Sequence, residues 1–277
     1  MADLYVSIVL YKTPAEVYER AVKSVLNSQL NLKLFLIDNH EDERAKSLAE
    51  RDSRILYIRT GKNLGYGKAH NVALRKAIED GVKYHLVMNP DVYFEKGTLE
   101  KLYEFMEENP EVGLVMPKVL YPDGRLQYLC KLLPTPLDLI GRRFLNWGPF
   151  KTLIEKRNYT YELRFTGYNK VMNVPFLSGA FLFIRTEVLK KIGIFDERFF
   201  LYCDDLDLSR RIHSVSKTIY YPHCHIYHDW GRGSYRSIRL LLIHVLDAIR
   251  YFNKWGWFKD EERERINKET LEKVKGL

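Results

Sequence analysis

The order of apolar and amphipathic segments in the first 120 residues most constrains the fold. Four apolar runs of strand length alternate with longer segments whose apolar residues recur at helical spacing. The expected strands are Tyr5–Tyr11, Leu32–Ile37, Ile55–Ile58 and Tyr84–Met88, and the expected helices are Pro14–Ser28, Lys68–Asp80 and Gly97–Glu108. Because the strands have no alternating polar face, the pattern predicts a mostly parallel sheet with helices on both faces, the α/β class.

The next part of the chain is less regular. Residues 121–175 show no clear alternation of strands and helices, and six of the ten prolines lie between Pro110 and Pro149. We interpret this region as an insertion or a substrate-side region rather than a second domain. The α/β pattern then resumes with an expected strand at Gly179–Arg185, a helix near Glu187–Ile192 and a strand at Ile219–His228.

The end of the chain predicts an amphipathic helical extension. Polar residues recur at helical period between Arg236 and Lys254, and the rest of that helix surface is apolar. Such a helix either packs on the domain or lies in a membrane interface, and the sequence leaves both alternatives open. The charged tail after it is expected to form a helix that faces solvent.

Charge and cysteine content narrow the partners and the compartment. The chain has 277 residues and a formal net charge of +8, which favours an anionic partner such as a nucleotide or a phospholipid surface. We expect no specific nucleic-acid partner. Three scattered cysteines suggest neither a disulfide framework nor a zinc site and fit a reducing cytoplasm. No signal peptide and no transmembrane helix are expected, because no apolar span reaches about 18 residues.

Polar residues gather where the expected strands end, and ligands of parallel α/β sheets bind beyond the carboxyl ends of the strands. These positions are Tyr11–Lys12, Asp38–Asn39, Gly61–Gly67 and Asn89–Asp91. The stretch GKNLGYGKAHN, Gly61–Asn71, has neither phosphate-loop nor dinucleotide spacing. It either cradles phosphates with its backbone N–H groups or forms a turn and a helix entry, and both alternatives remain open.

Two further motifs contain candidate metal and phosphate ligands. In VMNPDVYF, an apolar strand delivers Asn89 and Asp91 to its carboxyl end, where one carboxylate and substrate phosphates suit a divalent cation. Taken alone, this motif favours a turn that caps the following helix. In HCHIYHDWGRGS, His228 lies at or past a strand end, and Arg232 and Arg236 follow in or after a glycine-flanked loop. Their guanidinium groups suit a diphosphate clamp.

The stretch LYCDDLDLSRR contains three carboxylates within four positions. If a helix begins here, Asp204 fits the N-cap, and Asp207 fits the third helical position and the ion-pair spacing to Arg211. Both acids therefore have a structural role available. Asp205 has none, because it points about 100° away from Asp204 around the helix. It is the candidate for a chemical role.

Seven segments occur together in a fixed order: SIVLYK, LIDN, GKNLGYGKAHN, MNPDV, VPFLSGAFLFIR, GIFDERFFLYCDDLDLSRR and HDWGRGS. From Tyr5 to Ser237 the chain thus resembles the family 2 glycosyltransferases, and most of all their rhamnosyltransferase-like branch, which builds bacterial surface polysaccharides such as O-antigen. The resemblance implies a GT-A fold with a Rossmann-like sheet, a nucleotide-sugar donor, a divalent cation (Mn²⁺ or Mg²⁺) and inversion at the anomeric carbon. It also implies a domain over 1–237, with a nucleotide-binding half (1–120) and an acceptor and catalytic half (121–237), followed by the extension 238–277.

The resemblance also assigns roles to matching residues. Asp205 would be the general base, and Asp91 and His228 would be the protein ligands of the metal. The donor nucleotide and its diphosphate would contact Leu10, Tyr11, Asp38, Asn63, Gly65, Asn89, Asp91, Arg232 and Arg236. The chain departs from the family pattern at Asn89, which replaces the first Asp of the Asp-x-Asp motif, and at Asp204, which replaces the more usual Glu.

The function that the resemblance implies is transfer of a sugar to a hydroxyl of a lipid-linked oligosaccharide or polysaccharide precursor. L-Rhamnose from dTDP-rhamnose is the first choice; a UDP-hexose donor, or a non-catalytic glycan-binding or scaffold relative, is the alternative. The expected location is cytoplasmic, peripheral on the inner face of the cytoplasmic membrane. A homodimer is left open.

Overall fold

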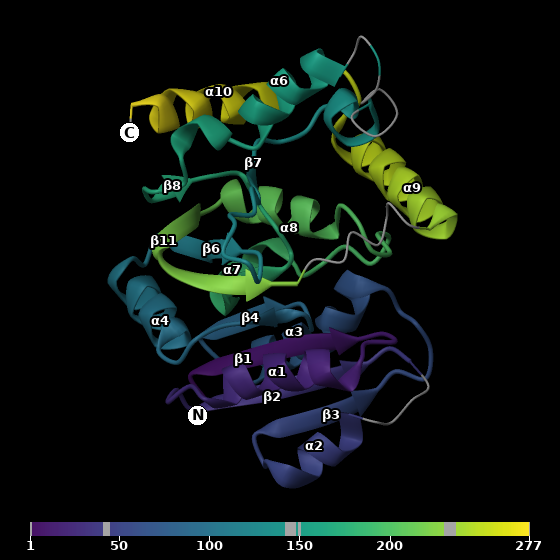
Figure 1. The fold of residues 1–277 in the computed structure, drawn as a ribbon, viewed down its shortest axis with the longest axis vertical. Helices are drawn as coiled ribbons and strands as arrows, with labels where there is room; N and C mark the ends of the chain where they lie inside the picture. The colour runs from purple at the N-terminus through teal and green to yellow at the C-terminus, as the bar shows by residue number, and fades with distance from the viewer. Residues whose placement is uncertain (1, 41–44, 142–147, 149–150, 230–236, 277) are drawn as a thin grey trace.

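The computed structural model describes residues 2–40, 45–141, 148, 151–229 and 237–276. Within them, nine strands form one sheet in the order β3-β2-β1-β4-β10-β6-β11-β5, with β8 paired to β11 (Figure 1). Their bounds are β1 Leu4–Leu10, β2 Leu32–Asp38, β3 Ile55–Arg59, β4 Tyr84–Met88, β5 Val92–Tyr93, β6 Val112–Leu120, β8 Met172–Asn173, β10 Phe181–Arg185 and β11 Lys217–His228.

The sheet is mostly parallel, as the sequence predicts. Strands β3, β2, β1 and β4 are parallel neighbours, and β6 is parallel to β11. Strand β10 is antiparallel to both β4 and β6 and joins the two parallel sets. The register places Leu10 beside Asp38, so the strand ends that the sequence singles out lie together at one edge.

Helices cover both faces of the sheet because alternate residues of each strand point to opposite sides. Leu4, Val6 and Ile8 of β1 belong to a core with α1 (Ala15–Leu26) and α4 (Thr98–Glu108), whereas Tyr5 and Val9 pack against α3 (Tyr66–Glu79). All seven residues of β1 are buried, which explains why its sequence is apolar without alternation. A short helix, α2 (Lys46–Arg51), precedes β3.

Apart from strands β8, β10 and β11, which belong to the sheet, residues after Leu120 form a second region, most of which lies above the sheet in Figure 1. Its elements are β7 (Cys130–Lys131), which pairs with β9 (Phe176–Leu177), the turn η2 (Leu137–Gly141), α6 (Lys151–Tyr161), η4 (Arg164–Thr166), α7 (Thr186–Ile192), α8 (Asp204–His213), α9 (Ile238–Trp255) and α10 (Glu261–Lys275). Phe199, Cys203 and Leu206 form a second core with Tyr251 and Ile266 of α9 and α10. The C-terminal helices therefore pack on the segment that contains α8.

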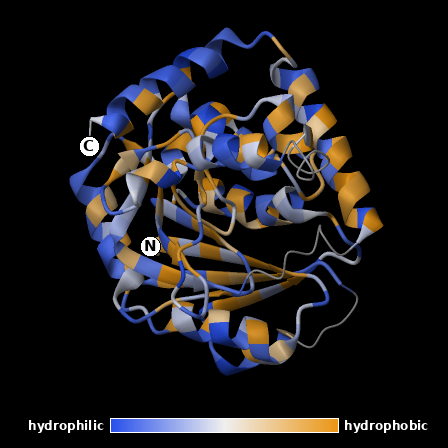
Figure 2. Cartoon of the chain, turned by 45° about the horizontal axis from the view of Figure 1, so that its top comes forward, coloured by the Kyte–Doolittle hydropathy of each residue, from blue (hydrophilic) through white to orange (hydrophobic). Residues whose placement is uncertain are grey.

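Helix α9 packs on the domain, which is one of the two alternatives that the sequence leaves open, and the expectation for α10 needs correction. The polar stripe of α9 does not face solvent as a whole, because Asp247 is fully buried against the domain. The opposite side is apolar and exposed at Ile238, Leu242 and Leu246, so α9 packs on the domain and still presents an apolar face (Figure 2). Helix α10 was expected to be solvent-facing, but its Ile266 is buried because the helix packs on the second core.

The described residues include no helix long and apolar enough to cross a bilayer.

Candidate active site

The first group of predicted site residues lies at the carboxyl ends of β1 and β2. Leu10 is buried, and Tyr11 just beyond it is exposed, with its ring 5.7 Å from that of His40. Asp38 is buried at the end of β2, where one carboxylate oxygen accepts the Tyr57 hydroxyl (2.7 Å) and the other accepts the His40 N–H (2.8 Å). The structure therefore holds Asp38 in one orientation at the sheet edge.

The glycine-rich loop is held to this edge by Asn39, which the sequence analysis places at a strand end without giving it a role of its own. The Asn39 amide accepts the Leu64 N–H and donates to the Gly65 carbonyl (2.8 Å) and the Asn63 side chain (3.2 Å). Asn63 in turn accepts the Gly65 N–H (2.9 Å). The position of Asn39, directly after Asp38 at a strand end, was the available signal.

The phosphate-cradle alternative for this loop is wrong. The Tyr66 N–H donates to the Phe200 carbonyl (2.7 Å), and the Gly67 N–H donates to Asp204 (3.0 Å). With the N–H groups of residues 64 and 65, four consecutive amides are thus bonded within the protein. The segment is a turn and a helix entry. Gly65 is required there, because its φ is 87° and an added Cβ would lie 2.2 Å from the Phe200 carbonyl oxygen.

The second group joins the end of β4 to the end of β11. The Nε2 atom of His228 lies 3.5 Å from the Asp91 Oδ1 atom and 3.5 Å from the Asn89 amide nitrogen. Asn89 also donates its backbone N–H to Ala180 (3.0 Å). The alternative in which Asn89 and Asp91 cap a helix is wrong, because Gly97 is the N-cap of α4 and β5 lies in between.

Gln127 fixes the orientation of His228 and was missed by sequence reasoning. Its amide nitrogen donates to the His228 carbonyl (2.7 Å), so its amide oxygen is the group that faces the His228 Nδ1 atom at 2.9 Å. Nδ1 must then carry the proton, and the Nε2 lone pair points toward Asp91. Gln127 comes from the irregular region before β7, and nothing in its sequence neighbourhood marks it.

The Asp91–His228 pair fits a cation. Burial lowers the pKa of His228 to about 4, so the ring is neutral at pH 7 and cannot form an ion pair with Asp91. The Asp91 Oδ1 atom is buried and lacks a hydrogen-bond partner, and burial raises the pKa of Asp91 to about 6. Two acceptor atoms therefore face each other, an arrangement that a divalent metal ion would satisfy.

The described residues contain no cluster of three or more His, Cys, Asp or Glu side chains that could hold a metal. A cation at Asp91 and His228 would therefore need further ligands from a substrate or from water.

The third group is the start of α8. Asp205 is partly exposed, and its Oδ2 atom accepts the Gly179 N–H (2.7 Å) while Oδ1 accepts the Leu206 N–H (2.8 Å). Burial raises the pKa of Asp205, and the Gly179 N–H opposes that rise. Asp204 is buried, with Oδ1 on the Asp205 N–H (3.0 Å) and Oδ2 on Gly67 (3.0 Å). Burial, followed by the charge of Asp205, raises the pKa of Asp204.

Asp204 is not the N-cap that the sequence predicts. Helix α8 starts at Asp204 itself, and Cys203 is the N-cap, with a φ of 63° and no side-chain cap. The reason is partly tertiary, because one oxygen of the Asp204 carboxylate accepts the neighbouring Asp205 N–H while the other reaches across to the start of α3.

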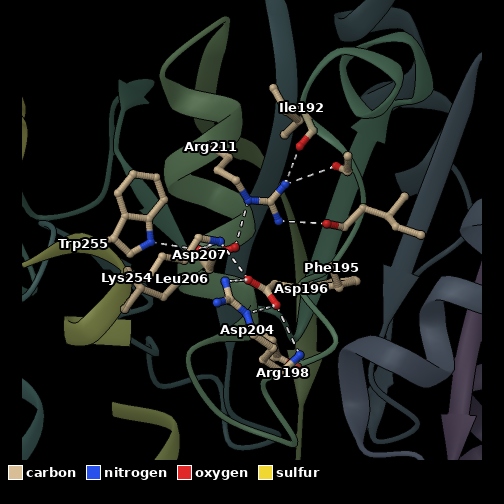
Figure 3. A network of polar contacts seen from close by, with 12 residues as sticks. Ile192, Phe195, Asp196, Arg198, Asp204, Leu206, Asp207, Arg211, Lys254 and Trp255 are labelled. Carbon is tan, nitrogen blue, oxygen red and sulfur yellow. Dashed lines mark hydrogen bonds and ion pairs between the residues drawn. The ribbon is translucent and has the colours of Figure 1, made fainter. Parts of the chain in front are cut away.

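Asp207 forms the ion pair that the sequence predicts, but the prediction that it is the third helical residue, in a capping pair with Asp204, is wrong because α8 starts one residue earlier. Its ion pair with Arg211 is present at 2.8 Å, and it also accepts the Trp255 indole N–H (2.8 Å) and contacts Lys254 (2.6 Å) (Figure 3). Lys254 also contacts Asp196 (2.9 Å). The end of α9 is thereby fastened to the first turn of α8.

Tyr66 connects the second and third groups. Its hydroxyl donates to the Gly179 carbonyl, next to the N–H that Asp205 accepts. Burial raises the pKa of Tyr66 well above its ordinary value, and the charges of Asp204, Asp205 and Asp91 act in the same direction. Tyr66 and Asp205 thus both form a hydrogen bond with Gly179. Arg232 and Arg236 lie outside the described residues.

The fold and these side chains define a glycosyltransferase of the GT-A type. The chain belongs to glycosyl transferase family 2, whose sequence model matches residues 5–193. It is 25% identical to the N-acetylglucosaminyl-diphospho-decaprenol L-rhamnosyltransferase of Mycobacterium tuberculosis, over 86% of this chain and 80% of that protein. It is 24% identical to the rhamnosyltransferase WbbL of Escherichia coli K12, over 85% of this chain and 87% of that one.

Solved structures with the same fold include GalNAc-T7 with UDP, GalNAc and Mn²⁺, which has a TM-score of 0.61 at 12% identity. The similarity covers 83% of this chain and 44% of that one. The mannosyltransferase PcManGT of Pyrobaculum calidifontis, in complex with GDP-Man and Mn²⁺, has a TM-score of 0.59 at 17% identity, over 90% of this chain and 64% of that one. At these identities the similarity shows the fold alone.

Proposed function

We propose that the protein is an inverting hexosyltransferase that moves a sugar from a nucleoside diphosphate to an acceptor hydroxyl. The observation that carries the proposal is the position of Asp205, a partly exposed carboxylate whose Oδ2 atom accepts the Gly179 N–H (2.7 Å). The carbonyl of the next residue, Ala180, accepts the Asn89 N–H (3.0 Å), and the Asn89 side chain lies 3.5 Å from His228 of the Asp91–His228 pair. In this proposal residues 1–120 bind the donor nucleotide, and residues 121–237 supply the base and the acceptor side.

Asp205 would act as the general base. It would take the proton from the acceptor hydroxyl while that oxygen forms a bond to the anomeric carbon and the bond to the diphosphate oxygen breaks. Attack from the face opposite the leaving group inverts the configuration. The pKa of Asp205 is raised by burial, which makes the carboxylate a stronger proton acceptor.

Asp91 and His228 would hold Mn²⁺ or Mg²⁺, which supplies charge neutralisation for the leaving diphosphate. Gln127 would hold the His228 ring so that Nε2 faces that site. Leu10, Tyr11, Asp38, Asn63, Gly65 and Asn89 would line the donor site, and Arg232 and Arg236 would add positive charge beside the diphosphate.

The proposed donor is dTDP-L-rhamnose. Its support is the two relatives named as rhamnosyltransferases, one of which acts, by its name, on N-acetylglucosaminyl-diphospho-decaprenol. A lipid-linked acceptor follows from that name as well. A UDP-hexose is the alternative donor, because the GT-A fold is also found in a protein solved with UDP and GalNAc.

The test is turnover of a panel of nucleotide sugars with lipid-diphosphate acceptors, with Mn²⁺, with Mg²⁺ and with a chelator. We expect release of the nucleoside diphosphate only with metal, fastest with dTDP-L-rhamnose, and slower by about 10²- to 10⁴-fold in Asp205→Asn. Faster turnover of a UDP-hexose would select the alternative donor. Binding of a glycan without turnover of any donor would contradict the proposal and favour a glycan-binding or scaffold role.

Peripheral membrane association is part of the proposal. Ile238, Leu242 and Leu246 recur every four residues along α9 and are 79%, 58% and 51% exposed. Such a stripe suits the interface of the anionic inner face of the cytoplasmic membrane, where the basic chain would also be attracted. Leu242→Glu with Leu246→Glu should reduce co-sedimentation with anionic vesicles, and Leu153→Glu, an exposed leucine of α6, is the control. Equal sedimentation of both variants would contradict the claim.

A further inference from the structure

Asp247 lies in the middle of α9 and is fully buried, yet the proposed reaction does not use it. Its Oδ2 atom accepts three consecutive backbone N–H groups, those of Phe200 (3.1 Å), Leu201 (3.0 Å) and Tyr202 (3.0 Å). Its Oδ1 atom contacts Arg250 on the same helix (2.7 Å). The carboxylate therefore organises a backbone segment that lies 45 to 47 positions earlier in the chain.

Successive amides that converge on one oxygen form a binding site for an anion. Three successive N–H groups that point to one place do not find acceptors within their own segment. They therefore need an acceptor from another part of the chain. Hydrogen bonds to a charged acceptor are also stronger than those to a neutral one. Asp247 thus supplies the anion that fixes the conformation of residues 200–202.

The segment 200–202 lies between the donor side and the catalytic helix. On one side, the Phe200 carbonyl accepts the Tyr66 N–H (2.7 Å) and lies against Gly65. On the other side, the chain passes through Cys203, whose φ of 63° is a left-handed conformation, and enters α8 with Asp205 in its first turn. A shift of this segment would move Asp205 relative to Tyr66 and Gly179.

We propose that Asp247 is a positioning residue, which sets the place of the general base from a helix outside the part of the chain that matches the family. This inference rests on the proposed function, because it assigns Asp247 a part in that reaction. The carboxylate does not touch the reacting atoms. It holds the segment 200–202 so that Asp205 meets the acceptor hydroxyl in a productive geometry.

The test compares Asp247→Asn with Tyr251→Phe. Asn keeps the size of the side chain and one acceptor oxygen but removes the charge. Tyr251→Phe removes a buried hydroxyl from the same helix, one that contacts Arg210 and not residues 200–202. We expect Asp247→Asn to lower kcat by roughly tenfold to a hundredfold, since misplacement by about 1 Å has that effect, while the donor KM changes less than about twofold. Tyr251→Phe should leave kcat within about twofold.

A second readout does not depend on activity. Amide hydrogen exchange at residues 200–202 reports local opening of this segment, and it should become at least tenfold faster in Asp247→Asn. In Tyr251→Phe the exchange rate should be unchanged. Equal kcat losses in both variants, or unchanged exchange in Asp247→Asn, would overturn the inference. If the unaltered protein turned over no donor, both the proposed function and the catalytic part of this inference would be contradicted. The hydrogen-exchange result would still show whether Asp247 holds residues 200–202 in place.

Discussion

The N-terminal part of the molecule, residues 2–120, and the C-terminal part, residues 121–276, hold their polar side chains in different ways. Among the described residues, Asp38 is the one buried charged side chain of the N-terminal part, whereas the C-terminal part buries eight: Asp138, Glu162, Asp204, Asp207, Arg210, Asp247, Asp260 and Arg263. The core of the N-terminal part contains instead a neutral group, Ser7 between His70 and His85 (2.7 and 2.8 Å).

The difference follows from how each part is built. In the N-terminal part, parallel strands bring short apolar segments side by side, and polar residues remain at the strand ends. In the C-terminal part, α9 and α10 close over the catalytic helix, and charged side chains make the connections. Arg210 of α8, for example, is 1% exposed and pairs with Asp260, 50 positions later. Packing thus stabilises the N-terminal part, and buried charge holds α8, which contains the proposed base Asp205.

The largest expected effect separates catalysis from donor binding. Asp205→Asn removes the proposed base and should lower kcat by about 10²- to 10⁴-fold, while calorimetry detects unchanged nucleotide binding. Asn39→Ala, which loosens the loop at the donor edge, should instead raise the donor KM more than it lowers kcat. The two variants could instead lose nucleotide binding equally. That result would contradict the proposal that the N-terminal part binds the donor and the C-terminal part supplies the base.

The second prediction compares a buried ion pair with an exposed one. Asp260→Asn keeps the N-cap of α10 but leaves Arg210 with the half-exposed Glu262 as its remaining charged partner, and it should lower the free energy of unfolding by up to about 3–5 kcal/mol. Asp52→Asn breaks the partly exposed Asp52–Arg54 pair of the N-terminal part and should cost less than about 1 kcal/mol. Urea denaturation measures both values. Equal losses would show that buried charge does not distinguish the two parts.

The third prediction tests how Gln127 holds His228, the residue of the C-terminal part that faces Asp91 of the N-terminal part. Gln127→Leu removes the acceptor for His228 Nδ1–H and should weaken Mn²⁺ binding by about 10- to 100-fold, measured by electron paramagnetic resonance. Gln127→Glu keeps an acceptor oxygen at that position and should retain most of the affinity. If both variants bound Mn²⁺ like the unaltered protein, Gln127 would have no part in the metal site.

The smallest effect concerns pH, and it has opposite signs for two groups of the N-terminal part, His85 and Asp91. Burial lowers the pKa of His85 to about 3, so below pH 6.5 the unfolded chain binds a proton that the folded one does not, and stability rises with pH. Burial raises the pKa of Asp91 to about 6, so between about pH 4 and 6 the folded chain retains the extra proton, and stability falls with rising pH.

Each of these groups changes the slope by at most about 1.4 kcal/mol per pH unit. In chelator-treated protein between pH 4.5 and 6, His85→Gln should therefore make the slope of stability against pH less positive, and Asp91→Asn should make it more positive. Chemical denaturation across this range measures both slopes. A change of the same sign in both variants would contradict the assigned pKa directions.

Much of the N-terminal part could be predicted because its signal is local. An apolar run of strand length is typical of a buried strand in a parallel sheet that is covered on both faces. The predicted strand Tyr84–Met88 therefore has the same first and last residues as β4. The polar residues after such runs, Asp38 and Asp91, then lie at the same edge because parallel strands share their direction. The start of α8 could not be predicted in this way, because Asp204 accepts a hydrogen bond from a residue 137 positions away and is not the N-cap.

The sequence by itself determined which side chains reach the edge of the sheet, because strand periodicity and direction depend on neighbouring residues. The tertiary structure alone decided how those side chains are held. Gln127 meets His228 101 positions away, and Asp247, which helical periodicity placed in a polar stripe, turns inward to residues 200–202. Such contacts depend on how helices pack after the chain has folded, and a buried carboxylate finds its partner there because leaving it unpaired costs more than any local alternative.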